Sequence, residues 1–566
     1  MRRIEWPAAI GIVVIVLACA SAAAAQRGDG EPRDDQRGEG QRPPEQRPRL
    51  VVVIVVDQLR TDYIEKFGHH WTGGLRRLID QGAWFRLAEY PYWNTVTCPG
   101  HATIGTGSFP SSHGMILNQW WDREAGTQMG CTLDPRLSKV SGAGNESPGD
   151  GPWRLRLPTL ADEMRMQLGG KSRVVSLSLK ARSAIGLAGQ RGDAVVWWQG
   201  DRFVTSTAYA QKPVDFVEEY MRVRPVVRDH GKTWEKLLPA HAYMYADDMP
   251  GERPRSGRIT FPHAVGPGRE PDNTFYTQWR RSPFSDAYLG ELAKAAVDSL
   301  KLGHGETDFL GVSFSALDYV GHDFGPRSHE VQDTLARLDR TIGELLDHLD
   351  RAVGSDNYVV ALSADHGVSP IPDQIAEEGI EAGRLNTGTM ARRLDEILSL
   401  HLGPGRHIAR FLYTELYFAP GVYDRLLNNP AALDAVMSEL WRTPGVARVF
   451  RGDELAGRPA TDDPLMRAAA LGYHPGRSGD LIVLAKPFWI ATGTDATTHG
   501  SGYTYDRRVP VILMGPAFHP GDYYSPATPA DIAPTLGHLL GVVLAAPDGR
   551  ILGEALAPRR TPTPRR

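Results

Sequence analysis

The first long apolar segment of the chain, residues 50–56, has the sequence LVVVIVV and contains no polar residue. A mostly β-branched run without alternation predicts a strand that is buried on both faces of a parallel sheet. Comparable runs lie at residues 172–179, 308–314, 358–362, 480–484 and 509–513. We therefore expect several strands of this buried type.

Helical periodicity separates some of these runs. The clearest case is a series of apolar residues spaced three and four apart, namely Val331, Leu335, Leu338, Ile342, Leu345 and Leu349. This spacing predicts an amphipathic helix of about five turns. Strands that alternate with helices predict an α/β fold, in which helices flank a mostly parallel central sheet on both faces.

Two segments interrupt this alternation. Residues from about 190 to 300 are rich in Trp, Tyr, Arg and Pro, and residues from about 370 to 475 carry helical patterns of their own. A chain of 566 residues is longer than one ordinary core requires, so it forms one large domain with insertions or two domains. We interpret residues 49–557 as a single domain whose two insertions cover an active site.

The N-terminus resembles an export signal. Met1–Arg3 is charged, residues 8–17 are apolar, and residues 21–25 are small, which predicts a secretory signal peptide over residues 1–25. We therefore expect a periplasmic or extracellular protein. Two alternatives are lipoprotein processing at Cys19 and an uncleaved N-terminal anchor.

Residues 26–48 and 558–566 lack apolar periodicity and are rich in Pro and Arg. Such composition predicts a disordered linker and a disordered tail. The net charge of −4 gives no electrostatic reason to expect binding to nucleic acid or to a membrane surface. Small molecules are the expected partners.

Acidic and imidazole side chains follow the predicted strands, where open parallel sheets bind ligands. They are Asp57 after the first strand, Asp318 and His322 after residues 308–314, Asp365 and His366 after residues 358–362, and His499 in a loop before residues 509–513. A lone Asp after a strand is usually a turn or cap residue, so the combination carries the prediction. Three Asp and three His suit two zinc ions, each with three protein ligands and an open position.

A candidate nucleophile, the hydroxyl group of Thr97, lies in the segment NTVTCPGHATIGTG, residues 94–107. Pro99 favours the first turn of a helix, which places Thr97 at the helix N-terminus, where free N–H groups attract an anion. Beside a zinc ion, the Thr97 hydroxyl can act as a nucleophile. The alternative is that Thr97 only caps the helix, and Thr95, Thr103 and Ser108 are competing hydroxyls.

Only Cys98 and Cys131 remain after removal of the predicted signal peptide. An exported protein can join them in one disulfide, but two separate small residues are an equally good interpretation.

The segment Thr97-Cys-Pro-Gly-His101 resembles the Thr-x-Pro-x-His nucleophile segment of the alkaline phosphatase superfamily, especially of its nucleotide pyrophosphatase/phosphodiesterase group. The resemblance extends to four further motifs: Asn118 in HGMILNQW, Asp318-x-x-x-His322, Asp365-His366-Gly367 and Thr498-His499-Gly500. It covers residues from about 50 to 182 and from about 308 to the C-terminus. The two insertions have no counterpart in it.

The resemblance implies a role for each of these residues. One zinc ion would be held by Asp57, Asp365 and His366 together with the Thr97 oxygen, and the other by Asp318, His322 and His499. Asn118 and main-chain N–H groups beside Thr97 would donate to phosphoryl oxygens. The implied reaction is an in-line displacement between two zinc ions through a covalent phospho-threonine intermediate.

Lys180 and Arg182 indicate which phosphate ester is the substrate. They follow residues 172–179 and resemble the Lys-x-Arg pair of phosphate-irrepressible alkaline phosphatases, which diesterases of the group generally lack. A monoester is a dianion and needs additional cationic partners, so we expect a phosphate monoesterase. The alternatives are a phosphodiesterase or nucleotide pyrophosphatase and a hydrolase of phosphonates or phospholipid headgroups. Sulfatases begin the nucleophile segment with Cys or Ser and end it with Arg, unlike this chain.

Overall fold

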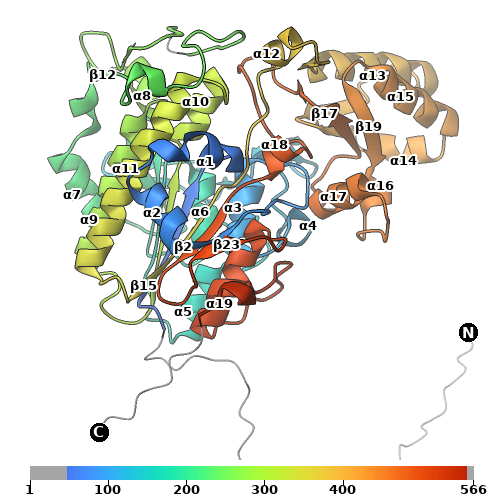
Figure 1. The fold of residues 1–566 in the computed structure, drawn as a ribbon. Helices are drawn as coiled ribbons and strands as arrows, with labels where there is room; N and C mark the ends of the chain where they lie inside the picture. Colours follow the sequence, from blue (N-terminus) through green and yellow to red (C-terminus); the bar gives the residue numbers. More distant parts are fainter. Residues whose placement is uncertain (1–46, 256, 558–566) are drawn as a thin grey trace, which may run out of the picture. The chain divides into compact units, whose positions relative to one another are not determined.

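Strand β1 (Leu50–Val56) lies near the middle of an 11-stranded sheet (Figure 1). The computed structural model describes residues 47–255 and 257–557, which belong to one compact unit. The strands of this central sheet, in spatial order, are β23 (Gly521–Tyr523), β2 (Gly82–Phe85), β22 (Val511–Met514), β15 (Tyr358–Ser363), β1, β14 (Asp308–Phe314), β9 (Val174–Ser178), β10 (Ala194–Gln199), β11 (Arg202–Ser206), β6 (Lys139–Ser141) and β7 (Gly144–Glu146).

The middle of the central sheet is parallel. Strands β15, β1, β14, β9 and β10 run in one direction, whereas β22 pairs antiparallel with both β15 and β2. The run predicted at residues 509–513 is therefore a strand of this sheet, but not a parallel one. Val55 lies opposite both Ser313 and Ser363, so the carboxyl ends of β14, β1 and β15 are level at one edge.

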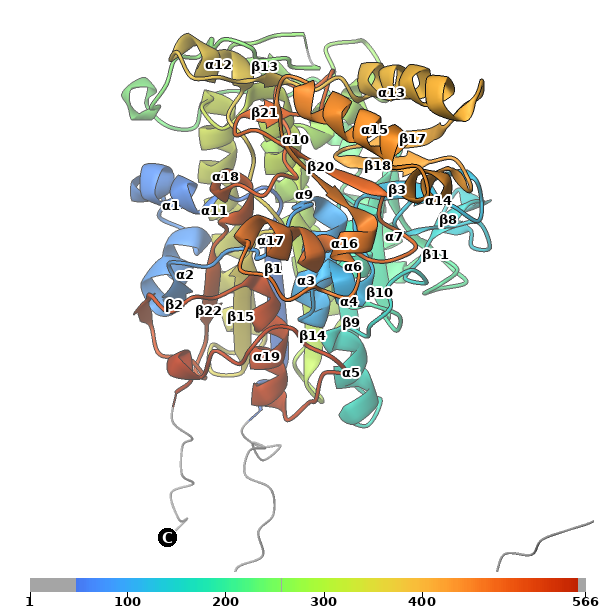
Figure 2. The ribbon, with the colours of Figure 1, turned by 90° about the vertical axis from the view of Figure 1, so that its right-hand side faces the viewer.

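Helices cover both faces of the central sheet (Figures 1 and 2). Even-numbered residues of β1 pack with α2 (Gly74–Gln81), α9 (Pro283–Leu300) and α11 (His329–Ala352). Odd-numbered residues pack with α5 (Leu160–Gln167), α6 (Ala181–Ala188) and α19 (Ile532–Leu540). Because β1 is buried on both faces, its sequence shows no alternation. The predicted fold class is confirmed, and the helix expected from the Val331 series is α11.

The second insertion extends past its predicted end at residue 475 and contains a separate four-stranded antiparallel sheet, drawn in orange in Figure 1, together with the paired short strands β16 (Gly383–Arg384) and β21 (Trp489–Ile490). Its strands, in spatial order, are β17 (Ile408–Leu412), β18 (Glu415–Phe418), β20 (Leu481–Ala485) and β19 (Val446–Arg451). Helices α13 (Thr387–Leu402) and α15 (Pro430–Arg442) pack on one face, and α17 (Pro464–Gly472) packs on the other. The expectation that residues 480–484 join the parallel sheet is wrong. Strand β20 is covered on both faces, so its apolar run has the pattern of a central parallel strand.

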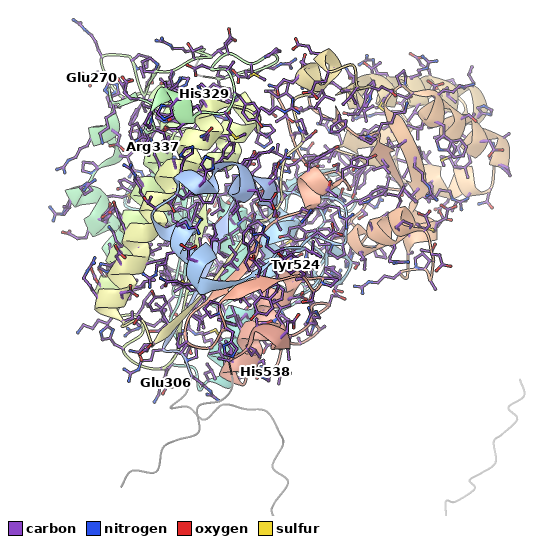
Figure 3. The ribbon with its side chains drawn as sticks, in the orientation of Figure 1. Glu270, Glu306, His329, Arg337, Tyr524 and His538 are labelled. Atoms are coloured by element: carbon purple, nitrogen blue, oxygen red, sulfur yellow. A yellow bond between two sulfur atoms is a disulfide. The ribbon has the colours of Figure 1, made fainter. Side chains whose placement is uncertain are left out.

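The first predicted insertion is fastened to helix α11. Its first strands, β10 and β11, extend the central sheet, while α7 (Asp215–Val223) and α8 (Asn273–Arg280) pack against α9. Asp333 of α11 accepts hydrogen bonds from Trp234 Nε1 (2.7 Å) and Arg337 Nε (2.6 Å). Arg337, labelled in Figure 3, also donates to the carbonyl oxygen of Glu235 (2.6 Å). These contacts hold the segment on the α11 side of the sheet.

The predicted signal peptide and tail and nearly all of the predicted linker lie outside the described residues. Between residues 47 and 557, leaving out residue 256, no helix has both the length and the apolar character needed to cross a membrane.

Candidate metal centre

Four neighbouring strands bring the candidate residues to one edge of the central sheet. In the spatial order β15, β1, β14 and β9, the strands are followed by Asp365, Asp57, Asp318 and Lys180. These residues are far apart in the sequence, and the level ends of the parallel strands place them side by side. This edge is where an open α/β sheet binds its ligands.

Asp57, Asp365 and His366 form a fully buried group, whose ligand atoms lie within 4.8 Å of one another. His366 Nε2 is 3.4 Å from Asp57 Oδ1 and 3.4 Å from Asp365 Oδ2. Two atoms bound to one tetrahedral zinc ion at about 2.1 Å would be about 3.4 Å apart. All three atoms are buried without a hydrogen-bond partner, although buried polar atoms are almost always paired. The group therefore fits a metal ion.

Asp318, His322 and His499 form a second group beside the first. Asp318 Oδ1 is 3.3 Å from His322 Nε2 and 3.6 Å from His499 Nε2, so each imidazole has ligand spacing to Asp318. The ligand atoms of the three residues do not all lie within 4.8 Å of one another, so His322 is the more loosely placed of the predicted ligands. Helix α10 (Ala316–Phe324) places Asp318 and His322 one turn apart on the same face. The rings of His366 and His499 stack with centroids 3.5 Å apart, and ligand atoms of these two residues and Asp318 lie within 4.8 Å of one another. The two groups are thus adjacent.

Backbone carbonyl groups orient the three imidazole rings. The contacts of 2.8 to 2.9 Å are from His322 Nδ1 to Thr497 O, from His366 Nδ1 to Gly367 O and from His499 Nδ1 to Thr95 O. A carbonyl only accepts, so each Nδ1 carries a proton and a neutral ring keeps its lone pair on Nε2. Burial lowers the pKa of His366 and of His499, which favours the neutral form. Metal-binding histidines are held in this manner.

Three carboxylates converge on this edge, and Lys180 is the cation between two of them. Lys180 Nζ lies 2.6 Å from Asp57 Oδ2 and 2.5 Å from Asp318 Oδ2. Burial, Asp318 and Asp365 raise the pKa of Asp57 well above its ordinary value. Burial acts in the same direction on Asp318, but Lys180 and His322 overcome it and hold the pKa of Asp318 well below the ordinary value. One ammonium group does not balance three carboxylates, so the edge attracts further cations.

Thr97 is the first residue of helix α3 (Thr97–Thr106) and is 1% exposed. The N-cap residue is Val96, so Thr97 is not itself the cap. His101, one turn further along, links this helix to the first ligand group: its Nδ1 lies 2.9 Å from Thr97 O and 3.3 Å from Asp365 Oδ2. The Thr97 hydroxyl is thus carried by a helix that is anchored to the candidate ligands.

Asn118 is held beside Thr97 by the backbones of two joined cysteines. Cys98 and Cys131 form a disulfide, which decides between the two interpretations that the sequence allowed. Asn118 Oδ1 accepts a hydrogen bond from the Cys98 N–H (2.8 Å), and the Asn118 carbonyl accepts one from the Cys131 N–H (3.0 Å). The side-chain Nδ2 of Asn118 is therefore left to donate elsewhere. The Cys98 N–H already donates to Asn118 Oδ1. The expectation that main-chain N–H groups beside Thr97 contact a phosphoryl oxygen therefore does not hold for the Cys98 N–H.

Lys180 and Arg182 lie at the start of helix α6, Lys180 as its N-cap residue and Arg182 in its first turn. Lys180 is buried between the carboxylates described above, whereas Arg182 Nε is buried without a hydrogen-bond partner. The predicted basic pair therefore lies at the same edge as the candidate ligands.

Gln58 belongs to this site, although the sequence analysis did not select it. Its backbone N–H donates to Asp365 Oδ1 (3.1 Å) and its Nε2 donates to Asp318 Oδ1 (2.8 Å), so it bridges the two groups. Gln58 adopts a φ of +71°, which is uncommon for a residue with a side chain, and strained backbone of this kind clusters at active sites. Its position directly after Asp57 was the only signal in the sequence.

The fold and this edge of carboxylates and imidazoles define a family. The chain belongs to the type I phosphodiesterase / nucleotide pyrophosphatase family, whose pattern matches residues 51–508. Membership makes the protein a hydrolase.

Individual relatives are similar over most of the chain. This chain is 32% identical over 511 residues to alkaline phosphatase PafA of Elizabethkingia meningoseptica, and the match covers 88% of this chain and 92% of that protein. It is 31% identical over 504 residues to alkaline phosphatase PhoV of Synechococcus elongatus, covering 88% and 90%. The crystal structure of PafA superimposes with a TM-score of 0.83 at 31% identity and covers 90% of this chain and 99% of that one. Murine ectonucleotide pyrophosphatase/phosphodiesterase 5, at a TM-score of 0.51 and 14% identity, shares the fold alone.

Proposed function

We propose that this protein is an exported, zinc-dependent phosphate monoesterase, an alkaline phosphatase, that acts through a phospho-threonine intermediate. The observation that carries the proposal is the adjacency of two Asp/His groups with ligand spacing to Thr97 at the start of α3. The names of PafA and PhoV, the similar alkaline phosphatases, support it. Export rests on the charged and apolar pattern of residues 1–25.

In this proposal two zinc ions occupy the two groups. Asp57, Asp365 and His366 hold one ion together with Thr97, and the other is held by Asp318, His322 and His499. When bound, two such metal ions would stabilise the attacking and the leaving oxygen of an in-line displacement. Gln58 and the backbone carbonyl groups keep the ligands in place.

The chain's own residues carry out two displacements at phosphorus. In the first, Thr97 Oγ1 forms a bond to phosphorus while the bond to the alcohol oxygen breaks, and the alcohol leaves. In the second, water displaces Thr97 and inorganic phosphate is released. Asn118 supports both steps because its Oδ1 is fixed by the Cys98 N–H, which leaves Nδ2 to donate to a phosphoryl oxygen.

Lys180 and Arg182 are proposed to favour monoesters, because a dianionic phosphoryl group gains more from two cations than a singly charged diester does. A solved variant of PafA carries substitutions at a threonine, an asparagine, a lysine and an arginine. Their intervals along that chain equal those between Thr97, Asn118, Lys180 and Arg182 in this one. The second candidate function is phosphodiesterase activity, which the name of the family favours.

Acid quenching during turnover of a phosphate monoester tests the proposal. We expect a phosphoryl group on the peptide that contains Thr97, detected by mass spectrometry, and no such adduct in Thr97→Ala. Elemental analysis should find about two zinc ions per chain. Rapid turnover of diesters with negligible turnover of monoesters would select the second candidate function instead.

A further inference from the structure

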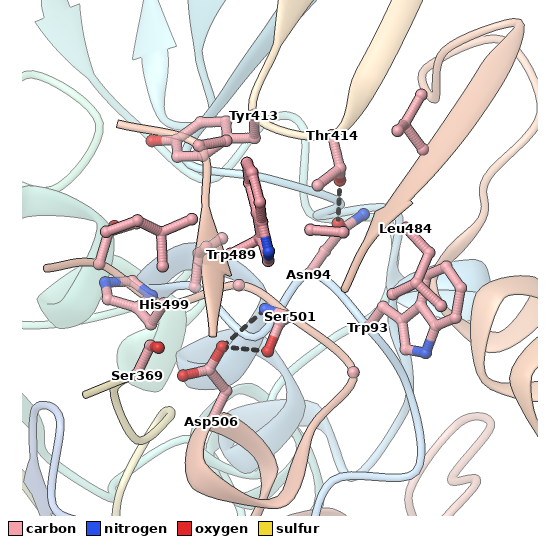
Figure 4. Close-up of a pocket in the computed structure, with 18 of the residues that line it drawn as sticks. Trp93, Asn94, Ser369, Tyr413, Thr414, Leu484, Trp489, His499, Ser501 and Asp506 are labelled. Carbon is pink, nitrogen blue, oxygen red and sulfur yellow. Dashed lines mark hydrogen bonds between the residues drawn. The ribbon is translucent and has the colours of Figure 1, made fainter. Parts of the chain in front are cut away.

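A cavity lies beside His499 (Figure 4). Most of its lining comes from three parts of the chain: the segment before the nucleophile helix, which contributes Trp93, Asn94 and Val96, the loop 498–506, and the second insertion. The cavity is therefore formed where that insertion meets the proposed catalytic edge.

We propose that this cavity receives the alcohol part of the substrate and that the preferred substrates are monoesters of flat, largely apolar alcohols that carry no negative charge. The inference rests on the proposed function and names its substrate class. Benzyl and aryl phosphates are the simplest members of this class.

The position of the cavity assigns it to the leaving group. His499, a member of the second ligand group, lines the cavity, whereas Asp57, Asp365 and His366 of the first group do not. In an in-line displacement the leaving oxygen departs opposite the nucleophile. Since Thr97 acts with the first group, the alcohol emerges on the side of the second group, where the cavity lies.

The chemistry of the walls selects a flat ligand without a negative charge. Apart from Trp489 and Tyr413, the insertion contributes mostly aliphatic residues, namely Val483, Leu484, Ala485, Ile490 and Ala491. Among the described residues, no Lys or Arg lines the cavity. Asp506 accepts hydrogen bonds at Oδ2 from the Ser501 N–H (2.8 Å) and hydroxyl (2.5 Å), both drawn in Figure 4, while its Oδ1 is buried without a hydrogen-bond partner. An anionic leaving group would thus lose its hydration without gaining a cationic partner.

Trp489 presents a fixed aromatic surface with one unused donor. Gly383 and Gly445 back the ring, and a Cβ added at Gly445 would lie 2.1 Å from Trp489 Cε3. Trp489 Nε1 is buried without a hydrogen-bond partner. A ring of the ligand can stack on this surface, and an acceptor atom on the ligand can pair with Nε1.

Another part of the wall is a hairpin turn that is anchored next to the nucleophile segment. Tyr413 and Thr414 connect β17 to β18, and Tyr413 adopts a φ of +51°. Thr414 Oγ1 donates to Asn94 Oδ1 (3.3 Å), and Asn94 Nδ2 donates to Glu415 Oε1 (2.9 Å). Asn94 lies three residues before Thr97, so the turn is held close to the reacting end of the site.

Benzyl and methyl phosphate test the assignment, because their alcohols have nearly equal acidity and differ in the ring. In Trp489→Ala we expect kcat/KM for benzyl phosphate to fall by about tenfold, the loss of one well-packed aromatic contact, while methyl phosphate changes much less. Trp489→Phe should keep part of the preference for benzyl phosphate. Trp441→Ala is the matched control, because Trp441 is an exposed residue of the same insertion and does not line the cavity.

An unchanged ratio of benzyl to methyl kcat/KM in Trp489→Ala, or an equal loss in Trp441→Ala, would overturn the assignment. Calorimetry with benzylphosphonate and methylphosphonate separates it from the proposed reaction, since neither ligand is turned over. Benzylphosphonate should bind about tenfold more weakly to Trp489→Ala than to the wild type, and methylphosphonate equally to both. Equal binding of benzylphosphonate to the two proteins would refute the cavity's role even if monoesters are hydrolysed through Thr97.

Discussion

The two candidate ligand groups are built differently. Asp57, Asp365 and His366 directly follow two adjacent central strands and are completely buried. In the second group, Asp318 and His322 lie on helix α10 and His499 lies in an irregular loop, and the side chain of His322 is 18% exposed. The register of the sheet determines the first group, whereas the second depends on how a helix and a loop are held.

Both insertions hold the loop that carries His499. Arg384 of the second insertion donates to the carbonyl oxygens of Asp495 (3.0 Å) and Ala496 (2.7 Å), and Arg255 of the first insertion forms an ion pair with Asp495. Insertions that look peripheral in the sequence thus position one half of the site. We therefore expect the side of the proposed nucleophile to be the more rigid one and the proposed leaving-group side to be the more adaptable one.

The largest expected effect is at Thr97, which we propose to act with the first ligand group, Asp57, Asp365 and His366. Thr97→Ala should lower kcat for monoesters by on the order of a thousandfold or more, because it removes the attacking oxygen. Zinc content and thermal stability should stay near those of the wild type, and Thr97→Ser should keep some activity. Near-normal turnover by Thr97→Ala would show that water attacks phosphorus directly.

The second prediction compares one ligand from each group. Asp365→Asn should release more zinc than His322→Gln, because Asp365 is buried among preorganised partners and His322 is at the exposed side. Replacing a residue that only hydrogen-bonds to a metal ligand lowers metal affinity by about 10- to 100-fold. Asp365 is itself a proposed ligand, so we expect Asp365→Asn to lower zinc affinity by more than this. Competition with a chelator, monitored by elemental analysis, measures both affinities. Equal losses would show that the two groups do not differ in rigidity.

The third prediction concerns Lys180, which contacts Asp57 of one group and Asp318 of the other. Replacing Lys180 and Arg182 together by Ala should lower monoester kcat/KM by on the order of a hundredfold. Each charge-assisted hydrogen bond contributes roughly 1.5 to 3 kcal/mol, and about 1.4 kcal/mol corresponds to tenfold. Diester hydrolysis by the same protein should change much less and serves as the control. A parallel loss for both substrates would remove the basis for monoester preference.

The smallest expected effect is that of the disulfide, which stiffens the nucleophile's side further. Replacing Cys98 and Cys131 together by Ser should lower kcat by about tenfold, because Asn118 is held by the backbones of both residues. A double-mutant cycle with Asn118→Ala checks the cause. If the cysteines act by positioning Asn118, their replacement should have little further effect on kcat once Asn118 is Ala. Fully additive losses would mean that the disulfide stabilises the protein without aiming Asn118.

Much of the site could be predicted because the relevant patterns are local. The apolar run before Asp57, the Asp365-His366 pair and the periodicity of α11 each lie within one element, so period and residue type suffice to find them. Parallel strands share an edge at their carboxyl ends, and for this reason the predicted ligands were expected to meet.

Tertiary structure alone decided how these elements combine. The neighbour order β15, β1, β14 and β9, the antiparallel direction of β22 and the placement of β20 in a second sheet depend on contacts between distant segments, which no local pattern contains. The bridging role of Gln58, the Cys98–Cys131 disulfide and the cavity under Trp489 likewise arise only when separate loops pack together. The sequence by itself therefore determined which chemical groups end the strands, and long-range packing decided which of them face one another.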